Sequence, residues 1–503
     1  MPIAQPIPES QLIGAPIDPV AGISPEDAIQ RSPHQLYSKL LPKKFYELHE
    51  KQAPWSFHPD LPTQPIWGFN GNFPGPTFMS RYGEPCLVRI HNDLPKSSNL
   101  GFGIPSTSTH LHNGHTASES DGFPGDYINS GQFHDHHYPH VLPGFTTDPN
   151  GIGDKNEALH TLWYHDHRAD FTASNTYAGL VGFHLLFDDV DSGDEEDTNP
   201  QALRLPSGEY DVPLIFADRA FDSNGMLFFD NFNFDGMLGD KYLVNGAIQP
   251  FMRVARRKYR FRFLGVGPSR FWQFHLSDDS PMTQIAEDGN LLPIPVVRTG
   301  GIRMGVAERC DVIIDFSKYK LGDTVYLQNR LEQIDGRGPT GNILLPGDSL
   351  LKFIVDHDAK DPSQVPSKLC SLPSINPAEV VQTRTWRFER QNGGWAINGQ
   401  FFDVNTIRAH VKQNTAEFWV LQNSGGSWSH PLHIHFEEFR ILSRNGLVPP
   451  LWEQGRKDVV KLNPNEQVVF FMRFRDWTGR YPFHCHNTVH EDHAMMIRWE
   501  LEA

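Results

Sequence analysis

The sequence predicts an all-β protein made of three related β-sandwich domains. Its 503 residues include 40 Pro and 42 Gly, which break many short apolar runs, and no long stretch has helical periodicity. A degenerate repeat recurs at the spacing of one sandwich domain. A chain of this length is too long for a single core and suits about two to four domains.

The repeat pairs an aromatic strand with an Asn-Gly turn, followed by an alternating apolar segment. The turns contain Asn70, Asn245 and Asn398, and their spacings are 245 − 70 = 175 and 398 − 245 = 153 residues. Each spacing suits one β-sandwich. The strands with their turns are 67–71, 242–246 and 395–399, and the alternating segments are 86–90, 259–263 and 418–421.

The composition of the remaining segments predicts an arm, a linker, a domain boundary and a surface loop. The Pro-rich residues 1–51 predict an extended arm over the first domain, and the acidic run 188–197 predicts a solvated linker. The polar stretch 358–377 predicts a second boundary. Residues 148–156 are rich in Gly and Asp and predict a surface loop. A calcium site is the disfavoured alternative, because the oxygen ligands lack the spacing of a known calcium loop. The predicted domains are 1–188, 200–358 and 375–503.

The formal charge of −16 argues against nucleic acid or an anionic membrane as partner, because both need a basic face. The N-terminus lacks the pattern of a secretory signal, and no stretch is long enough to span a bilayer. We therefore expect a soluble, cytoplasmic protein without a cleaved signal. Only four cysteines occur. Cys310 and Cys370 could pair, but free thiols are the expectation in a reducing compartment.

The largest concentration of potential metal ligands lies near the C-terminus. If this segment begins as a strand, Cys485 points to one face while His484 and His486 point to the other. A thiolate, His490 and Met495 are three ligands of a blue-copper centre, which needs one further His. A lone Cys or His is usually an inert core residue. The spacing of this group argues against that alternative.

Three further His-x-His pairs repeat the spacing of His484 and His486, and a strand would present both imidazoles of each pair to one face. Eight neutral imidazoles converging between two domains would lack partners without a metal, and imidazole suits copper and zinc. His430 precedes the last pair, and Pro431 is expected to bend the chain so that His430 faces Cys485. The pairs are His110 and His112, His165 and His167, and His433 and His435.

These motifs, in this order, resemble those of the multicopper oxidases, from about Trp67 to the C-terminus. Within that family the resemblance is to the three-domain bacterial type that includes spore-coat laccase, bilirubin oxidase and phenoxazinone synthase. It implies three cupredoxin-like Greek-key β-sandwich domains, the middle one a spacer without metal. The motifs are HLHNGHT at 110–116, SDG at 120–122, WYHDH at 163–167, YAGLVG at 177–182, and HCH at 484–486 with His490 and Met495.

The resemblance also implies four copper ions per chain, one of type 1, one of type 2 and two of type 3. An axial Met implies a moderate reduction potential, because the weak axial ligand tunes the couple. The implied ligands are His430, Cys485, His490 and Met495 for type 1, His110 and His433 for type 2, and for type 3 His112, His165 and His486 on one side with His167, His435 and His484 on the other.

In the implied reaction, a small reductant gives up one electron at a time at an exposed ring edge of a type 1 histidine. Cys485 connects that site through the backbone to His484 and His486, where O2 is reduced to two waters. Four protons are consumed, and Asp121 and Glu491 beside the ligand motifs are the candidate relays. Plain surface carboxylates are the alternative for both.

Other histidines and aromatics have simpler explanations than a metal. The cluster at 134–140 resembles a strand of the family, so exposed imidazoles on a structural strand are favoured over a fifth metal site. His115 and His493 are expected to hydrogen-bond near the ligands. Trp428 lies where bilirubin oxidase has a Trp beside the type 1 site, and it either shapes a substrate surface or packs at a strand end.

The predicted activity is a laccase-like oxidation of phenols or aminophenols with O2 as acceptor. A bilirubin oxidase, or an iron or manganese oxidase that uses Glu437 and Glu438, is the alternative. A copper-binding or structural coat protein is the non-enzymatic alternative, and the spore coat is then its location. Nitrite reduction is disfavoured, because it predicts a trimer of two-domain chains. A monomer is the expectation here.

Overall fold

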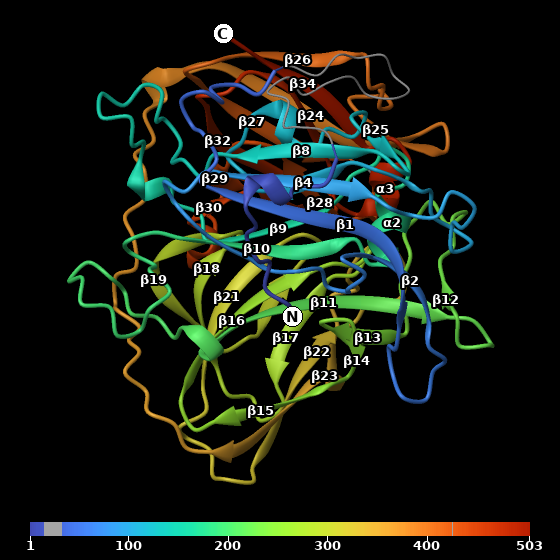
Figure 1. Ribbon diagram of the computed structural model, residues 1–503, viewed down its shortest axis with the longest axis vertical. Coiled ribbons are helices and arrows are strands. Elements are labelled where there is room, and N and C mark those ends of the chain that lie inside the picture. The colour runs from blue at the N-terminus through green and yellow to red at the C-terminus, as the bar shows by residue number, and fades with distance from the viewer. Residues whose placement is uncertain (15–32, 425) are drawn as a thin grey trace.

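Strands dominate the computed structural model, which describes residues 1–14, 33–424 and 426–503 (Figure 1). Six larger sheets form three successive pairs along the chain. The all-β prediction is confirmed, whereas the domain boundaries stay predictions. The three pairs run from Lys44 to Phe187, from Asp211 to His357 and from Val380 to Glu502.

The first pair consists of two four-stranded sheets with a small two-stranded sheet beside them. The first sheet has the order β2 (Gln64–Phe69), β1 (Lys44–Trp55), β4 (Cys86–Asn92) and β8 (Phe133–Tyr138). The second has the order β3 (Phe78–Arg81), β10 (Val181–Phe187), β9 (Thr161–Asp166) and β6 (Thr109–His112). The small sheet pairs β5 (Ser106–Thr107) with β7 (Ile128–Asn129).

The second pair joins an eight-stranded sheet to a five-stranded one. The larger sheet has the order β14 (Ala247–Ile248), β13 (Lys241–Val244), β11 (Asp211–Phe221), β16 (Lys258–Gly265), β21 (Arg309–Asp315), β18 (Met282–Glu287) and β19 (Asn290–Arg298), with β12 (Leu227–Phe228) on β11. The smaller one has the order β15 (Phe251–Ala255), β23 (Ile343–His357), β22 (Thr324–Leu331), β17 (Trp272–Leu276) and β20 (Ile302–Met304).

The third pair joins a six-stranded sheet to a five-stranded one. The larger has the order β25 (Gly394–Ile397), β24 (Val380–Gln391), β27 (Thr415–Asn423), β32 (Gln467–Phe474), β29 (Phe439–Arg444) and β30 (Arg456–Lys457). The smaller has the order β26 (Ile407–Lys412), β34 (Met496–Glu502), β33 (Gly479–Cys485), β28 (His430–Ile434) and β31 (Val459–Leu462).

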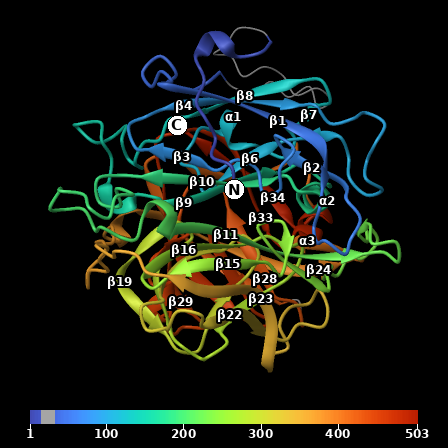
Figure 2. The same ribbon diagram turned by 60° about the horizontal axis from the view of Figure 1, so that its bottom comes forward.

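The helices are short and lie between strands. Both views show α2 and α3 side by side (Figures 1 and 2). The α-helices are α1 (Ser118–Asp121), α2 (Thr172–Ala178) and α3 (Thr488–Asp492). The 3-10 helices are η1 (Glu9–Gln11), η2 (Lys155–Glu157), η3 (Gly208–Tyr210), η4 (Pro377–Glu379) and η5 (Leu451–Glu453).

The predicted repeat is confirmed in the backbone of all three sheet pairs. In each pair a first strand pairs antiparallel with the strand before the Asn-Gly turn and parallel with the alternating segment. Asn70, Asn245 and Asn398 have positive φ, as do the glycines that follow them. Their side-chain oxygens each accept a backbone N–H from the first strand at 2.7–2.8 Å. The Asn therefore fixes each turn to the sheet, since it tolerates the left-handed conformation and bonds locally.

The first and last sheet pairs occupy the upper half of Figure 1, and the green and yellow middle pair lies below them. Each pair has its own apolar core, and a fourth cluster joins Trp163 and Val181 of the first pair to Ile215 and Leu264 of the second. The acidic run after β10 is not wholly solvated as predicted. Asp191 is buried, and both its oxygens accept hydrogen bonds from Arg260 on β16.

The N-terminal arm agrees with the prediction only in part. Ile3 bridges to Thr77 and Ile7 bridges to Phe45, so the first residues lie against the first sheet pair. However, β1 already begins at Lys44, within the segment predicted to be an arm. Residues 15–32 of that segment lie outside the described residues.

Candidate metal centres

Cys485 ends β33 with its sulfur beside two imidazoles. Its Sγ lies 3.5 Å from Nδ1 of His430 and 3.7 Å from Nδ1 of His490, and these nitrogens are 3.2 Å apart. The three residues have no exposed surface. Met495 is also buried, and its carbonyl accepts the N–H of Cys485 at 3.0 Å. Three of the four predicted donors of a blue-copper centre therefore converge here, and Met495 is joined to Cys485 through its backbone.

The path of the chain explains this convergence without the predicted bend at Pro431. β28 runs unbroken from His430 to Ile434 and pairs with both β31 and β33. Because side chains alternate along a strand, His430 and His433 point to opposite faces. His490 comes from α3, which follows β33 directly. The expected bend is wrong, but its consequence, two faces serving two groups, holds.

Burial sets the protonation of the Cys485 group. Burial raises the pKa of the Cys485 thiol and lowers the pKa of His430 to about 3. It also holds the pKa of His490 well below its ordinary value. Neutral imidazoles keep a free lone pair that can bind a metal ion. A buried thiol gives up its proton readily only when a cation binds the sulfur. The group is therefore suited to a metal ion.

The expectation of an exposed ring edge at the Cys485 group is wrong. The Trp395 ring packs on His490 at 4.0 Å between centroids, and Nε2 of His490 lies 3.1 Å from the carbonyl of Asp235. Asp235 follows Phe234, whose carbonyl accepts the indole N–H of Trp395. These two residues come from a loop between β12 and β13 of the middle sheet pair. That pair is thus more than the spacer that was predicted.

Four His-x-His pairs meet between the first and third sheet pairs. In each pair at least one histidine lies in a strand, and all eight side chains are buried. β6 pairs with β9 so that His110 opposes His165, and β28 pairs with β33 so that His433 opposes His484. Two antiparallel strand pairs therefore direct their imidazoles into one space. The predicted convergence is confirmed.

Three of these imidazoles form a tight triangle. The Nε2 atoms of His167, His435 and His484 lie 3.1–3.2 Å from one another. Like nitrogens this close in a buried space need a shared cation, because three neutral rings cannot all donate and accept in such a triangle. These are the three residues predicted for one type 3 ion.

The second predicted type 3 set also comes together. One donor atom from each of His112, His165 and His486 lies within 4.8 Å of the other two. Both ring nitrogens of His112 and of His486 are buried without a hydrogen-bond partner. Orphaned buried nitrogens are costly unless a ligand pairs them. These residues therefore fit a metal ion.

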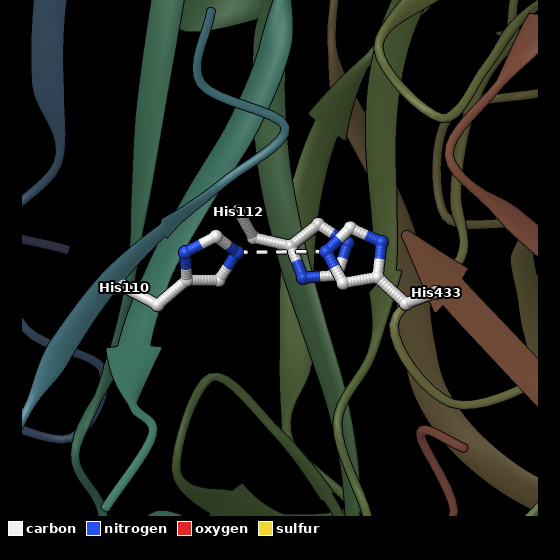
Figure 3. A group of neighbouring side chains, drawn as sticks. All are labelled: His110, His112 and His433. Atoms are coloured by element: carbon white, nitrogen blue, oxygen red, sulfur yellow. Dashed lines mark hydrogen bonds between the residues drawn. The ribbon is translucent and has the colours of Figure 1, made fainter. Parts of the chain in front are cut away.

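The last two histidines face each other across the same space. Nε2 of His110 lies 3.5 Å from Nε2 of His433. Figure 3 shows His110, His112 and His433 gathered in this space. His112 stacks on His433 at 3.7 Å between ring centroids. The Nδ1 atoms of His110 and His433 donate to the carbonyls of Asp121 and Asp458. These bonds leave the Nε2 lone pairs of His110 and His433 free to bind a metal ion.

Burial lowers the pKa of seven imidazoles in this cluster. Burial lowers the pKa of His165 to about 3 and that of His167 to about 4. The remaining imidazoles with a shifted pKa follow the same direction, and burial is the main cause. Unprotonated imidazole is the form that binds copper.

Carboxylates surround the imidazoles on their far sides. Asp121 Oδ2 lies 2.7 Å from Nδ1 of His435, and Glu491 oxygens lie 3.0 Å from Nδ1 of His484 and 3.5 Å from Nδ1 of His167. Both are buried, so the surface-carboxylate alternative is wrong. Carboxylates in this position orient ligand imidazoles.

Sequence reasoning missed Asp458. Its carbonyl accepts from His433, and its carboxylate lies 3.4 Å from Nε2 of His112. Arg309 of β21 holds that carboxylate with two hydrogen bonds, at 2.8 and 2.7 Å. The only signal was a charged pair, Lys457-Asp458, directly before the apolar run of β31.

Comparison with known proteins agrees with this geometry. Two models of the family described as multicopper oxidase match residues 52–143 and 374–502. The chain is 35% identical over 468 residues to a bilirubin oxidase of Albifimbria verrucaria, covering 90% of this chain and 75% of that protein. It is 30% identical over 513 residues to a laccase of Bacillus subtilis, covering 90% of this chain and 93% of that protein. The chain belongs to the multicopper oxidase family.

A solved multicopper oxidase structure shares the architecture. The crystal structure of a laccase from Pediococcus acidilactici has a TM-score of 0.77 and 27% identity, and the match covers 92% of each chain. This multicopper oxidase is accordingly a copper-dependent oxidoreductase with O2 as acceptor, and the family's cofactor is four copper ions of types 1, 2 and 3. Within the described residues, no helix has the length and apolar character needed to cross a membrane.

The histidines outside these groups have structural partners. The strand predicted in 134–140 is β8, but its imidazoles are not exposed as expected, since His136 and His137 are buried. His115 pairs with Asp476 at 2.8 Å rather than with a ligand group. His493 donates to the carbonyl of Val489 and thereby closes α3.

The remaining candidates also have ordinary explanations. All four cysteines are free, which confirms the expectation for Cys310 and Cys370. The carboxylate of Asp148 accepts three backbone N–H groups of its own loop, which stabilise the loop. Glu437 and Glu438 are buried and form ion pairs with arginines, so they offer no open site for a metal-ion substrate.

Proposed function

We propose that this multicopper oxidase is laccase-like and oxidises phenolic or aminophenolic small molecules by one-electron steps while reducing O2 to water. One observation carries the proposal. Cys485 belongs to one donor group, while His484 and His486, its covalent neighbours, belong to the other. The backbone of three residues is therefore the shortest connection between an electron-accepting site and an oxygen-reducing one.

The ligand assignment follows the donor groups. Bound copper supplies one-electron acceptance beside Cys485 and multi-electron reduction of O2 among the histidines. The type 1 ligands are His430, Cys485, His490 and Met495, and the type 2 ligands are His110 and His433. The type 3 ligands are His112, His165 and His486 on one side and His167, His435 and His484 on the other.

The pKa values of two buried carboxylates, Asp121 and Glu491, are shifted in opposite directions. Burial raises the pKa of Asp121 well above its ordinary value, and its Oδ2 faces Nδ1 of His435. Burial alone would also raise the pKa of Glu491, but His484 and His167 outweigh it and lower that pKa to about 2. Paired carboxylates whose pKa values are pushed apart commonly divide acid and base roles. Asp121 is the proposed donor and Glu491 the acceptor.

The substrate surface is centred on Trp428, because the type 1 histidines themselves are covered. Trp428 is half-buried and meets Trp395 edge to face at 5.2 Å between centroids. Trp395 in turn contacts His430 and His490. Two aromatic contacts thus connect Trp428 to His430 and His490, which contact Cys485. This supports a substrate-shaping role for Trp428 over strand-end packing.

Two partly exposed arginines border this surface. The guanidinium groups of Arg337 and Arg390 lie 5.0 and 5.5 Å from the Trp428 ring centroid, and each is also paired with a carboxylate, Asp335 at 3.7 Å and Asp235 at 2.5 Å. Their exposed guanidinium N–H groups suit an anionic aromatic reductant, and we propose that they recognise its charge. The bilirubin oxidase alternative remains, since its name-giving substrate in the related protein is also aromatic.

Kinetics with charged and neutral reductants test the surface. Arg337→Gln and Arg390→Gln should each lower kcat/KM for an aromatic sulfonate about tenfold and leave a neutral methoxyphenol unchanged, because only the anion loses an ion pair. Arg253→Gln, at an exposed site on β15, is the matched control. Equal losses for both reductants would refute charge recognition.

An absorption spectrum with a copper count tests the whole proposal. We expect four coppers per chain and an intense thiolate band at about 600 nm, as in blue-copper centres. Copper binding without O2 uptake from any reductant would favour the coat-protein alternative. Monomeric state and cytoplasmic or spore-coat location stay predictions, and light scattering with cell fractionation would decide them.

A further inference from the structure

A second histidine cluster lies outside the copper groups, on the first sheet. His49 of β1 is paired in register with His91 of the parallel strand β4. Their rings stack at 4.7 Å between centroids with an interplanar angle of 8°. Glu47 precedes His49 by two residues, so both point to the same face of the sheet.

Carboxylates hold both rings. Nδ1 of His49 lies 2.6 Å from Asp93, and Nε2 of His91 lies 2.8 Å from Oε1 of Glu47. A nitrogen of each ring and an oxygen of Glu47 all lie within 4.8 Å of one another. The four copper-binding groups meet this same criterion. The donors are thus already gathered.

We propose that Glu47, His49 and His91 bind one divalent ion of the zinc class. Two imidazoles and a carboxylate are a common zinc set, with Asp93 or water left for the fourth position. Glu47 and Asp93 together supply two negative charges, which balance the ion. Because the rings stack, His49 turns about its χ2 to direct a lone pair at the ion, and its partial exposure permits this.

The proposed site is separate from the copper groups. The copper groups draw their donors from β6, β9, β28, β33 and the segments that follow these strands, and they have no exposed surface. The new site lies on β1 and β4, where His49 and Asp93 reach solvent. An ion there ties the first long strand to its parallel neighbour and makes no contact with the reaction. Zinc should therefore raise thermal stability and leave oxidase activity unchanged.

Zinc titration of the copper-loaded protein tests this. Calorimetry with Zn²⁺ and elemental analysis after desalting should find one zinc per chain in addition to the copper. The double variant His49→Gln/His91→Gln should bind zinc at least tenfold more weakly and lose the zinc-dependent rise in Tm. The matched control is His410→Gln, because His410 forms a single exposed pair with Glu502 at 2.6 Å.

Each result decides for or against the site. Zinc uptake that is the same in the double variant and the wild type would overturn the proposal, as would an equal loss in His410→Gln. Blue absorbance shows whether the variants are folded. Should the double variant fail to fold, Glu47→Gln gives an independent reading, because it removes one donor and keeps both rings.

Discussion

The carboxylate of Asp121 lies 2.7 Å from Nδ1 of His435, and the carbonyl of the same residue accepts Nδ1–H of His110. One residue thus orients imidazoles assigned to two different copper ions. We expect Asp121→Asn to slow O2 reduction about 10- to 100-fold, as is typical for residues that orient metal ligands. Stopped-flow reoxidation of the reduced protein by O2 measures this.

The same variant should keep its blue band and its rate of anaerobic reduction by substrate, since Asp121 contacts no residue of the Cys485 group. Asp170→Asn is the control, because Asp170 is exposed and lies in the same sheet pair. Slower anaerobic reduction in Asp121→Asn would contradict the assignment.

Cys485→Ser should remove the blue band and substrate oxidation while the fold is kept. A hydroxyl replaces the thiolate without a change of volume large enough to disturb the core, and the histidine cluster keeps its donors. The copper count should therefore fall by one. Cys370→Ser, at a half-buried free thiol, should retain the band. Loss of all copper from Cys485→Ser would mean that the two groups do not load separately.

Trp428→Ala should lower kcat/KM for bulky aromatic reductants about tenfold, because a stacking surface worth roughly 1 kcal/mol or more disappears. The blue spectrum should not change, since Trp395 still covers His490. Trp452→Ala is matched to it, because Trp452 also lies under an arginine, Arg298, at 4.0 Å. A comparable loss of kcat/KM in Trp452→Ala would mean that the effect of Trp428→Ala comes from general destabilisation.

Asp191→Asn should destabilise the protein by about 2 kcal/mol at neutral pH. Burial would raise the pKa of Asp191, but Arg260 outweighs it and lowers the pKa to about 2. A lowered folded-state pKa contributes stability that is complete above the ordinary value of 3.8 and is lost as pH falls toward 2. Thermal unfolding at pH 7, 4 and 3 should show the gap between wild type and variant closing below pH 4. Asp189→Asn, exposed in the same loop, should show no gap.

Local patterns predicted most of the residues that converge in the candidate metal centres. A spacing of two residues puts both histidines of a pair on one strand face, so the eight imidazoles could be recognised without knowing the topology. Asp235 and Trp395 could not, because Asp235 reaches His490 from the second sheet pair and Trp395 reaches it from β25 of the third. Asp235 lies 255 residues from His490. The expectation of an exposed ring edge failed for this reason, as it took no account of a covering loop from another part of the chain.

His167 and His435, 268 residues apart, share one triangle of nitrogens. A growing chain therefore carries only part of each histidine site until its last strands have been synthesised. The shared space is complete only after translation has passed His486, so we expect metal loading to follow the synthesis of the last strands. Once loaded, the ions cross-link early and late parts of the chain, and protein made without copper should be the more readily cleaved by proteases.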